Sequence, residues 1–388
     1  MSRTTTTDTE KSVRRRYRRA AEAPEPALCC PTSYEPRYLE AIPREVLERD
    51  YGCGDPTPYV RPGDTVLDLG SGAGKMCFIL AQVAGPTGKV IGVDFTDEML
   101  ALARKHQREV ARRLGYDNVV FHRGRIQDLA LPLDEVEAYL QSRPVRTAAA
   151  LADFEAFCDR LRASAPLVAS ESVDVIVSNC VLNLVKESEK EKLFSEMYRV
   201  LRRGGRVAIS DIVSDEEVPS SMTRDPKLWS GCLAGALRED KFLAAFERAG
   251  FHGIQIEKYD AKPWQIVRGI EFRSVTVTAR KGKEGPCLER KQAVIYKGPW
   301  KEVLDDDGHR LRRGQRMAVC DKTFRILSSD PYAEEIVPVP PLKEVPLKKA
   351  RGFACSGDAL RHPRETKGKR FRKTVDATRS VCGPEGCC

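Results

Sequence analysis

The segment 65–84 constrains the fold more than any other part of the chain, because a short apolar run leads at once into a glycine-rich turn and a helical pattern. Thr65–Leu69 has the composition of a short buried strand, and the sequence GSGAG follows at positions 70–74. Lys75–Ala84 then continues as a helix. A strand, tight turn and helix in this order let the backbone approach a ligand closely at the tip of a parallel sheet.

The rest of the region 61–280 alternates strand-like and helix-like runs. We expect further strands at 90–93, 119–121, 173–177, 206–210 and 274–278, and helices at 97–114, 189–201 and 241–249. This alternation predicts an α/β fold with a doubly wound, mainly parallel sheet. Residues 135–169 interrupt the rhythm between the third and fourth strands, and we expect them to form a helical insertion over the sheet.

Shifts in composition divide the chain into four parts. Residues 1–60 are predicted to be a polar leader and cap that carries thiols, with a short helical stretch at 43–49. Residues 61–280 form the main domain, and 281–342 are predicted to be a small α+β C-terminal domain. Residues 343–388 are basic and end in cysteines, and we expect no regular structure there.

Charge and hydropathy exclude several classes of function. The net charge of +9 comes largely from Lys and Arg in the segments 14–19 and 348–373, which favours solvated tails over a nucleic-acid surface. No run of apolar residues is long enough for a transmembrane helix, and the N-terminus lacks the apolar stretch of a secretory signal. We therefore expect a cytoplasmic monomer that acts on a small molecule, with no nucleic-acid or membrane partner.

Two acidic residues indicate what the glycine-rich turn binds. Asp68 lies on the strand directly before the glycines, where it could face a cationic or amino-acid group but would repel a pyrophosphate. Asp94 ends the next strand, where a partner for ribose hydroxyls would lie. The pair favours a cationic nucleoside ligand over a dinucleotide, and a turn without any ligand is the remaining alternative.

The thirteen cysteines are the anomaly of the composition. In a chain without a secretory signal they indicate free thiols, metal ligands or redox pairs rather than a disulfide framework. Cys180 follows the fourth strand at the end that faces the ligand crevice, and Cys232 lies in a segment that can fold over that crevice. Cys53 lies in a glycine-flanked turn, and Cys29 and Cys30 lie in the leader. The alternative is that these cysteines are buried apolar residues.

The Asp68, glycine-loop and Asp94 pattern resembles the S-adenosylmethionine-binding motif of class I methyltransferases, which implies their Rossmann-like sheet. By this resemblance Phe95 packs on adenine, Ile126 and Gln127 lie beside the adenine amino group, and Asn179 lies near the methyl-donor end. The implied cofactor-binding residues are Asp68, Gly70, Gly72, Gly74, Asp94, Phe95, Ile126, Gln127 and Asn179.

Four motifs together resemble the arsenite S-adenosylmethionine methyltransferase family: YGCG at 51–54, LDLGSGAG at 67–74, SNCVLNL at 178–184 and the LW, GC and GAL elements at 228–237. The resemblance implies that Cys180 and Cys232 hold As(III) and that Cys53 is a third ligand or redox partner. It also implies that Cys29 or Cys30 pairs with Cys53. An external thiol reductant, such as glutathione or the thioredoxin system, would reopen the resulting disulfide. Two positions depart from the family: Gly231 stands where Glu is common, and Gln127 where an acid is frequent.

The expected chemistry explains these residue types. Thiolates are soft ligands that suit a soft, thiophilic centre, and bound As(III) keeps a lone pair that can attack a sulfonium methyl group without a general base. The expected function is arsenite methylation for detoxification. Two alternatives remain open at this point. One is a class I methyltransferase with a small organic acceptor, such as a quinone, sterol or thiol, and the other is a metalloid-binding or sensor protein without catalysis.

Overall fold

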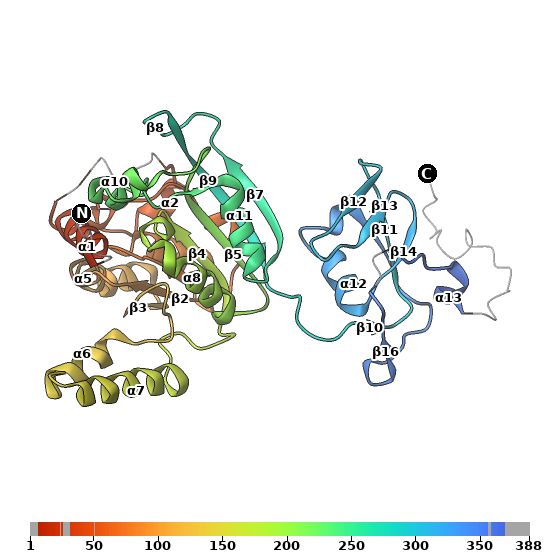
Figure 1. Cartoon of the computed structure of the whole chain (residues 1–388), viewed down its shortest axis with the longest axis horizontal. Helices are drawn as coiled ribbons and strands as arrows, with labels where there is room; N and C mark the ends of the chain where they lie inside the picture. The colour runs from red at the N-terminus through yellow and green to blue at the C-terminus, as the bar shows by residue number, and fades with distance from the viewer. Residues whose placement is uncertain (1–6, 24, 26–31, 50, 356–357, 369–388) are drawn as a thin grey trace. The chain divides into compact units, whose positions relative to one another are not determined.

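The chain forms two compact units, residues 1–282 and 283–388 (Figure 1). The computed structural model describes residues 7–23, 25, 32–49, 51–355 and 358–368. Cys29, Cys30, Cys382, Cys387 and Cys388 lie outside these ranges. Within the described residues, no helix is both long and apolar enough to cross a membrane.

A nine-stranded sheet is the centre of the first unit, and its main path has the order β3-β2-β1-β4-β5-β9-β7. The strands are β1 (Thr65–Leu69), β2 (Lys89–Asp94), β3 (Val119–Arg123), β4 (Val173–Asn179), β5 (Leu201–Ser214), β6 (Leu237–Arg238), β7 (His252–Tyr259), β8 (Gln265–Val267) and β9 (Ile270–Arg280). The first five are parallel to one another, and β9 runs antiparallel to β5. The strand order reverses between β1 and β4, which places a ligand crevice at their carboxyl ends.

Helices cover both faces of this sheet, which confirms the predicted doubly wound α/β fold. The helices α4 (Lys75–Ala84) and α5 (Asp97–Leu114) bury their apolar sides in one core, together with α2 (Pro36–Leu39) and α3 (Arg44–Leu47). The helices α8 (Glu187–Val200) and α11 (Glu239–Arg248) bury theirs in a second core on the other face. The predicted bounds of α4 and α5 match the structure. Apolar residues recur in both helices with helical spacing, and a glycine directly follows the last residue of each helix.

The expected polar leader contains a long helix, α1 (Thr7–Glu22), which the sequence analysis did not predict. The side chains of Arg14, Arg15, Arg18 and Arg19 on this helix are exposed, as expected for a solvated basic segment. Val13 and Ala20 are buried. Arg14 forms an ion pair with Asp97 at 2.8 Å, and Arg18 lies 3.0 Å from Glu98. The apolar face of α1 is narrow and lies among five arginines, which hides its period in the sequence.

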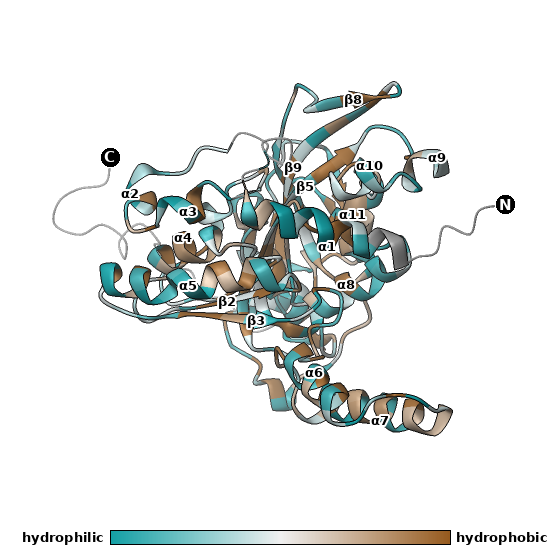
Figure 2. Ribbon diagram, turned by 90° about the vertical axis from the view of Figure 1, so that its left-hand side faces the viewer, coloured by the Kyte–Doolittle hydropathy of each residue, from teal (hydrophilic) through white to brown (hydrophobic). Residues whose placement is uncertain are grey.

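The insertion between β3 and β4 is a pair of helices, α6 (Leu133–Ser142) and α7 (Ala148–Ser164). The ring of Tyr139 stacks on that of Phe157 with their centroids 4.4 Å apart. Arg162 on α7 forms an ion pair with Asp128 at 3.1 Å, and this contact connects α7 to the segment that follows β3. Figures 1 and 2 show the two helices projecting away from the sheet rather than lying over it.

Small β-elements build the second unit. In one sheet β11 (Ala293–Tyr296) lies between β14 (Arg316–Ala318) and β15 (Ile336–Val339). Two further pairs are β12 (Glu302–Leu304) with β13 (Arg310–Arg312), and β10 (Leu288–Glu289) with β16 (Arg351–Gly352), while the helices are α12 (Asp321–Leu327) and α13 (Pro363–Lys367). Because β16 pairs with β10, and Arg361 contacts Glu289 at 2.8 Å, the unit continues beyond the expected boundary at residue 342. The expectation of an irregular segment from 343 therefore fails at residues 347–349, 351–352 and 363–367, which form short helices and a strand.

Candidate active site

A cleft opens at the carboxyl ends of the parallel strands in the first unit, with an empty volume of about 1120 Å³ that includes its open mouth. The loops after β1, β2, β3 and β4 line it, and α1 contributes one wall. Eight of the nine residues expected to bind the cofactor line this cleft: Asp68, Gly70, Gly72, Asp94, Phe95, Ile126, Gln127 and Asn179. No residue of α6 or α7 is among the described residues that line it.

Gly74 is the exception among the nine. It precedes α4 with a φ of +86°, and a Cβ atom at this position would lie 2.8 Å from the ring of Phe121. Gly74 therefore allows α4 to pack closely against β3. Gly72 differs, because nothing lies within 4 Å of the position its Cβ would take, and its φ is +50°. The backbone of Gly72 therefore leaves open space on the cleft side of the loop.

Asp94 shapes the glycine loop as well as facing the cleft. Its Oδ2 accepts a hydrogen bond from the amide of Gly72 at 2.9 Å, and its Oδ1 accepts one from the amide of Thr96 at 2.8 Å. Burial raises the pKa of Asp94, while these amides oppose the shift. Each oxygen retains lone-pair capacity for a further donor such as a ribose hydroxyl.

The remaining groups in the cleft also fit S-adenosylmethionine. The hydroxyl of Ser71 is buried and has no hydrogen-bond partner among the described residues, so the loop holds a polar group available to a ligand. The buried Asp68 carboxylate accepts a hydrogen bond from the Cys77 thiol at 3.2 Å and supplies negative charge near a cationic ligand. Apolar and aromatic side chains complete the lining: Val13, Met99, Phe95, Ile126 and Val185.

The structure adds cleft residues that the sequence did not indicate. The amide of Gln127 donates to the Glu189 carboxylate on α8 at 3.2 Å, so an acid does stand beside the position where the family often has one. Glu10 on α1 lines the same cleft and forms an ion pair with Arg125 at 2.8 Å. Both glutamates lie in helices outside the motifs, and no local pattern distinguishes them from solvent-exposed acids.

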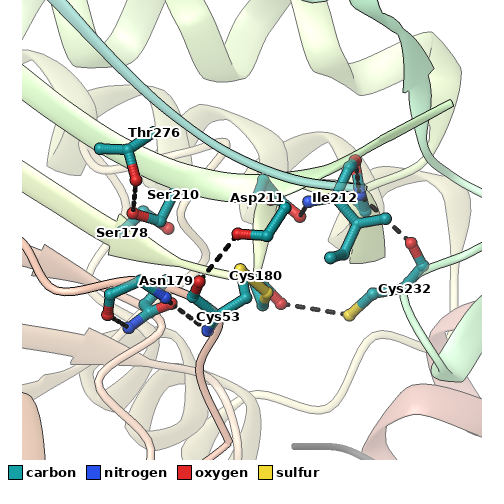
Figure 3. The surroundings of a disulfide bond; sticks show 12 residues. Cys53, Ser178, Asn179, Cys180, Ser210, Asp211, Ile212, Cys232 and Thr276 are labelled. Atoms are coloured by element: carbon teal, nitrogen blue, oxygen red, sulfur yellow. Dashed lines mark hydrogen bonds between the residues drawn. A yellow bond between two sulfur atoms is a disulfide. The ribbon is translucent and has the colours of Figure 1, made fainter. Parts of the chain in front are cut away.

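The three cysteines expected to hold arsenic lie in one buried cluster (Figure 3). Cys53 and Cys180 form a disulfide, and the Cys232 thiol donates to the Cys180 carbonyl at 3.2 Å. The cysteines share the cluster with Ile212, Met222, Leu233, Ala236, Ile270 and Phe272. The implied pairing of Cys53 with Cys29 or Cys30 therefore differs from the structure, in which Cys180 is the partner of Cys53.

The backbone at two of these cysteines lies in the left-handed region, where residues other than glycine are uncommon. The φ angle is 59° at Cys180 and 64° at Cys232. Such a conformation costs on the order of 1–3 kcal/mol and persists only where the surroundings impose it. Asn183 supplies part of that constraint, because its amide donates to the carbonyls of Cys232 at 3.2 Å and Ile212 at 2.6 Å. Strain of this kind collects at functional sites.

Asn179 fixes the turn that carries Cys53. Its Oδ1 accepts hydrogen bonds from the amides of Cys53 at 2.6 Å and Gly54 at 3.0 Å, and its Nδ2 donates to the Gly54 carbonyl at 2.7 Å. A Cβ atom on Gly52 would lie 2.5 Å from the Asn179 amide, which explains the glycine there. Asn179 lines the cleft, but its side chain is engaged by this turn rather than directed to a cofactor.

Replacing Asn179 with alanine is expected to lower kcat for methyl transfer by about 10- to 100-fold, because the turn that holds Cys53 loses three hydrogen bonds and reacting groups are misplaced. The KM for S-adenosylmethionine should change much less. Steady-state kinetics separates the two parameters. Asn118→Ala is the matched control, because Asn118 also donates to two carbonyls, of Ala81 at 3.2 Å and Gly85 at 2.8 Å, away from the cleft. Equal losses in both variants would contradict the assignment.

Asp211 is a buried carboxyl that holds the loop after Cys180. Its oxygens accept hydrogen bonds from the amides of Leu182 at 2.9 Å and Ile212 at 2.8 Å. Burial raises the pKa of Asp211 to about 6, although these amides and the charge of Lys190 act in the opposite direction. The folded state therefore favours the protonated carboxyl more than the unfolded state does, although the carboxylate prevails above a pH of about 6.

The raised pKa of Asp211 predicts a pH-dependent stability. Between its ordinary value of 3.8 and its folded value of about 6, the folded state binds more protons than the unfolded state. The wild type should then lose up to about 3 kcal/mol of unfolding free energy, relative to Asp211→Asn, as the pH rises through this window. Denaturant unfolding of both proteins across the window measures the difference. A difference that does not change with pH would refute the shift.

Tyr17 on α1 reaches the same cluster. Its hydroxyl lies 4.0 Å from the Cys232 sulfur, and its ring lines the cleft. Burial raises the pKa of Tyr17, and the neighbouring Cys232 raises it further. The phenol therefore stays neutral and can donate to a thiolate at Cys232. No local pattern around Tyr17 indicates this role.

Comparison with known proteins shows the family of this chain. The arsenite methyltransferase of Aquipseudomonas alcaligenes is 34% identical over 323 residues, covering 79% of this chain and 83% of its own length. The chain belongs to the arsenite methyltransferase family. The mouse arsenite methyltransferase is 28% identical over 371 residues, which cover 92% of this chain and 89% of the mouse protein.

Two family models and one solved structure also match this member of the arsenite methyltransferase family. Residues 61–250 match a methyltransferase domain, and residues 283–371 match a domain of unknown function. The crystal structure of an arsenic(III) S-adenosylmethionine methyltransferase from Chlamydomonas reinhardtii has a TM-score of 0.52 and 28% identity. The aligned region covers 85% of this chain and 99% of the algal chain. The S-adenosylmethionine-dependent class of the enzyme follows from these matches.

Proposed function

We propose that the enzyme methylates As(III) held by the thiolates of Cys53, Cys180 and Cys232. One observation carries the proposal: the three cysteines come from separate segments and share one buried cluster, and Cys180 also lines the cofactor cleft. Three soft ligands at the edge of a cofactor cleft suit a thiophilic metalloid. No comparable ligand set is needed for methylation of a carbon, oxygen or nitrogen acceptor.

Bound S-adenosylmethionine supplies an electrophilic methyl group on a sulfonium centre. Asp94 and the loop at 70–74 would bind its nucleoside, and the charge of Asp68 would favour its cationic part. The thiolates hold As(III) with its lone pair free, so the side chains need only position the lone pair in line with the methyl carbon. No proton is removed from the acceptor, which agrees with a thiol-lined site rather than one with a general base.

The Cys53–Cys180 disulfide fits the redox part of this proposal. Transfer of a methyl cation to the lone pair leaves arsenic formally pentavalent. Two thiolates can return two electrons to arsenic, which restores As(III) and joins the two sulfurs in a disulfide. An external thiol, such as glutathione or the thioredoxin system, would then reduce that disulfide. We extend the proposal to a cytoplasmic monomer that acts in arsenic detoxification.

Incubation with labelled S-adenosylmethionine and arsenite tests the proposal, with arsenic speciation as the readout. Enzyme in the disulfide form should give no product without a reductant, because two of the three proposed arsenic ligands are bonded to each other. Addition of glutathione or reduced thioredoxin should restore methylated arsenic. Absence of methylated arsenic in the presence of both reductants would refute the proposal.

A further inference from the structure

Three cysteines in the second unit form a cluster that the methylation site does not use. Cys287 directly precedes β10, Cys320 is the N-cap residue of α12, and Cys355 follows β16. Their sulfur atoms all lie within 4.8 Å of one another. Pairing of β10 with β16, extended by a hydrogen bond from the Phe353 amide to the Cys287 carbonyl at 2.9 Å, holds two of these segments together.

The cluster is held in place yet open to solvent on one side. Cys320 is fully buried, and its sulfur accepts a hydrogen bond from the Thr323 amide at 3.4 Å and lies 3.2 Å from the Thr323 hydroxyl. Cys287 is half-buried and Cys355 is exposed. A small ligand can therefore reach the sulfurs from the side of Cys355, while Cys320 forms the floor of the site.

We propose that Cys287, Cys320 and Cys355 bind one As(III) ion as a trithiolate, at a site separate from the methylation site. Three sulfurs match the three bonds of As(III), whose lone pair takes the place of a fourth ligand. A closed structural zinc site has four ligands, and in the described part of the chain no further His, Cys, Asp or Glu ligand atom joins this cluster. The choice of As(III) among thiophilic ions rests on the proposed function.

The binding reaction balances without a redox partner. As(OH)₃ loses its three hydroxyl groups as arsenic–oxygen bonds break, and three arsenic–sulfur bonds form. Each departing hydroxide takes one thiol proton, so three water molecules are released and arsenic stays trivalent. The site therefore needs neither S-adenosylmethionine nor a reductant beyond the one that keeps its thiols reduced.

The test counts arsenic bound to the full-length reduced chain after gel filtration, using elemental analysis after incubation with a small excess of arsenite over the proposed sites. Cys355→Ser and Cys320→Ser should each lower the count by one arsenic per chain, with affinity at this site reduced by about 100-fold. Cys158→Ser, which removes a buried thiol on α7, is the matched control and should leave the count unchanged. Because Cys355 is exposed, its variant should keep the fold even where Cys320→Ser does not, and circular dichroism checks this.

Methyl transfer by the same variants separates this inference from the proposed function. Cys355→Ser should keep the wild-type rate, since this residue lies outside the methylation cleft. If no variant or wild type methylates arsenite, the count of bound arsenic still decides the second site. An unchanged count in Cys355→Ser would overturn the inference. So would one zinc ion per chain at this cluster that arsenite does not displace.

Discussion

Replacing Cys180 with serine is expected to abolish arsenite methylation, with kcat/KM lower by about 1000-fold or more, which corresponds to about 4 kcal/mol of transition-state stabilisation. A serine hydroxyl is a harder ligand than a thiolate and stays protonated at neutral pH. The variant loses one of the three proposed arsenic ligands, and it also loses the partner of Cys53 in the disulfide. Methylated arsenic is measured in the presence of a thiol reductant. Cys232→Ser should give a loss of the same order.

Two controls show whether the loss of activity in Cys180→Ser results from impaired arsenite binding rather than from impaired cofactor binding or folding. Cys158→Ser makes the same chemical change at a buried position outside the cleft, and it should retain activity within about twofold. Affinity for S-adenosylmethionine should be nearly unchanged in Cys180→Ser. A methyltransferase with an organic acceptor would largely survive both substitutions, so substantial methyl transfer by Cys180→Ser would contradict the arsenic site.

Replacing Asp94 with alanine is expected to weaken S-adenosylmethionine binding by about 100-fold, or about 3 kcal/mol. The variant removes the acceptor for the amides of Gly72 and Thr96, which lie 2.9 and 2.8 Å from its oxygens, and it also removes the expected contact with ribose. Asp94→Asn retains one acceptor oxygen and should show a smaller loss. Calorimetric titration with S-adenosylmethionine measures the effect.

Asp174→Ala is the matched control for Asp94. The Asp174 carboxylate also accepts a hydrogen bond from a strand amide, that of Thr65 at 2.8 Å, but at the opposite end of β1. Its removal should cost stability without changing cofactor affinity. If both alanine variants lose cofactor affinity equally, the loss results from general destabilisation of the sheet, and Asp94 has no specific role in cofactor binding.

Periodicity was enough to predict the five parallel strands and β9 of the central sheet, whereas β6, β7 and β8 were not predicted. The apolar composition of residues 65–69 and the helical spacing of residues 97–114 act over a few residues, so β1 and α5 have the predicted bounds. The adjacent loop at 70–74 is equally local, because its glycines and Asp68 follow one another along the chain. These features needed no information about distant segments.

Local patterns were insufficient for α1 and for the end of the second unit. The helix α1 contacts segments that are remote in sequence, among them α5 and residues 227–230, and its charged residues concealed the buried face. The strand β16 has two residues and pairs with β10 more than sixty positions earlier. Basic composition alone therefore did not indicate the helix and the strand that packing forms in these segments.

By itself, the sequence determined the α/β fold, the position of the glycine loop and the residue types available for a soft ligand site. Only the tertiary structure decided which thiols meet. Cys53 and Cys180 are 127 residues apart and form a disulfide, because the turn before β1 is bound by Asn179 at the carboxyl end of β4. Pairing of β10 with β16 likewise brings the segments of Cys287 and Cys355 together, and Cys320 at the start of α12 completes the cluster. Local propensity acts within a few residues, whereas the meeting of distant side chains depends on how whole elements pack.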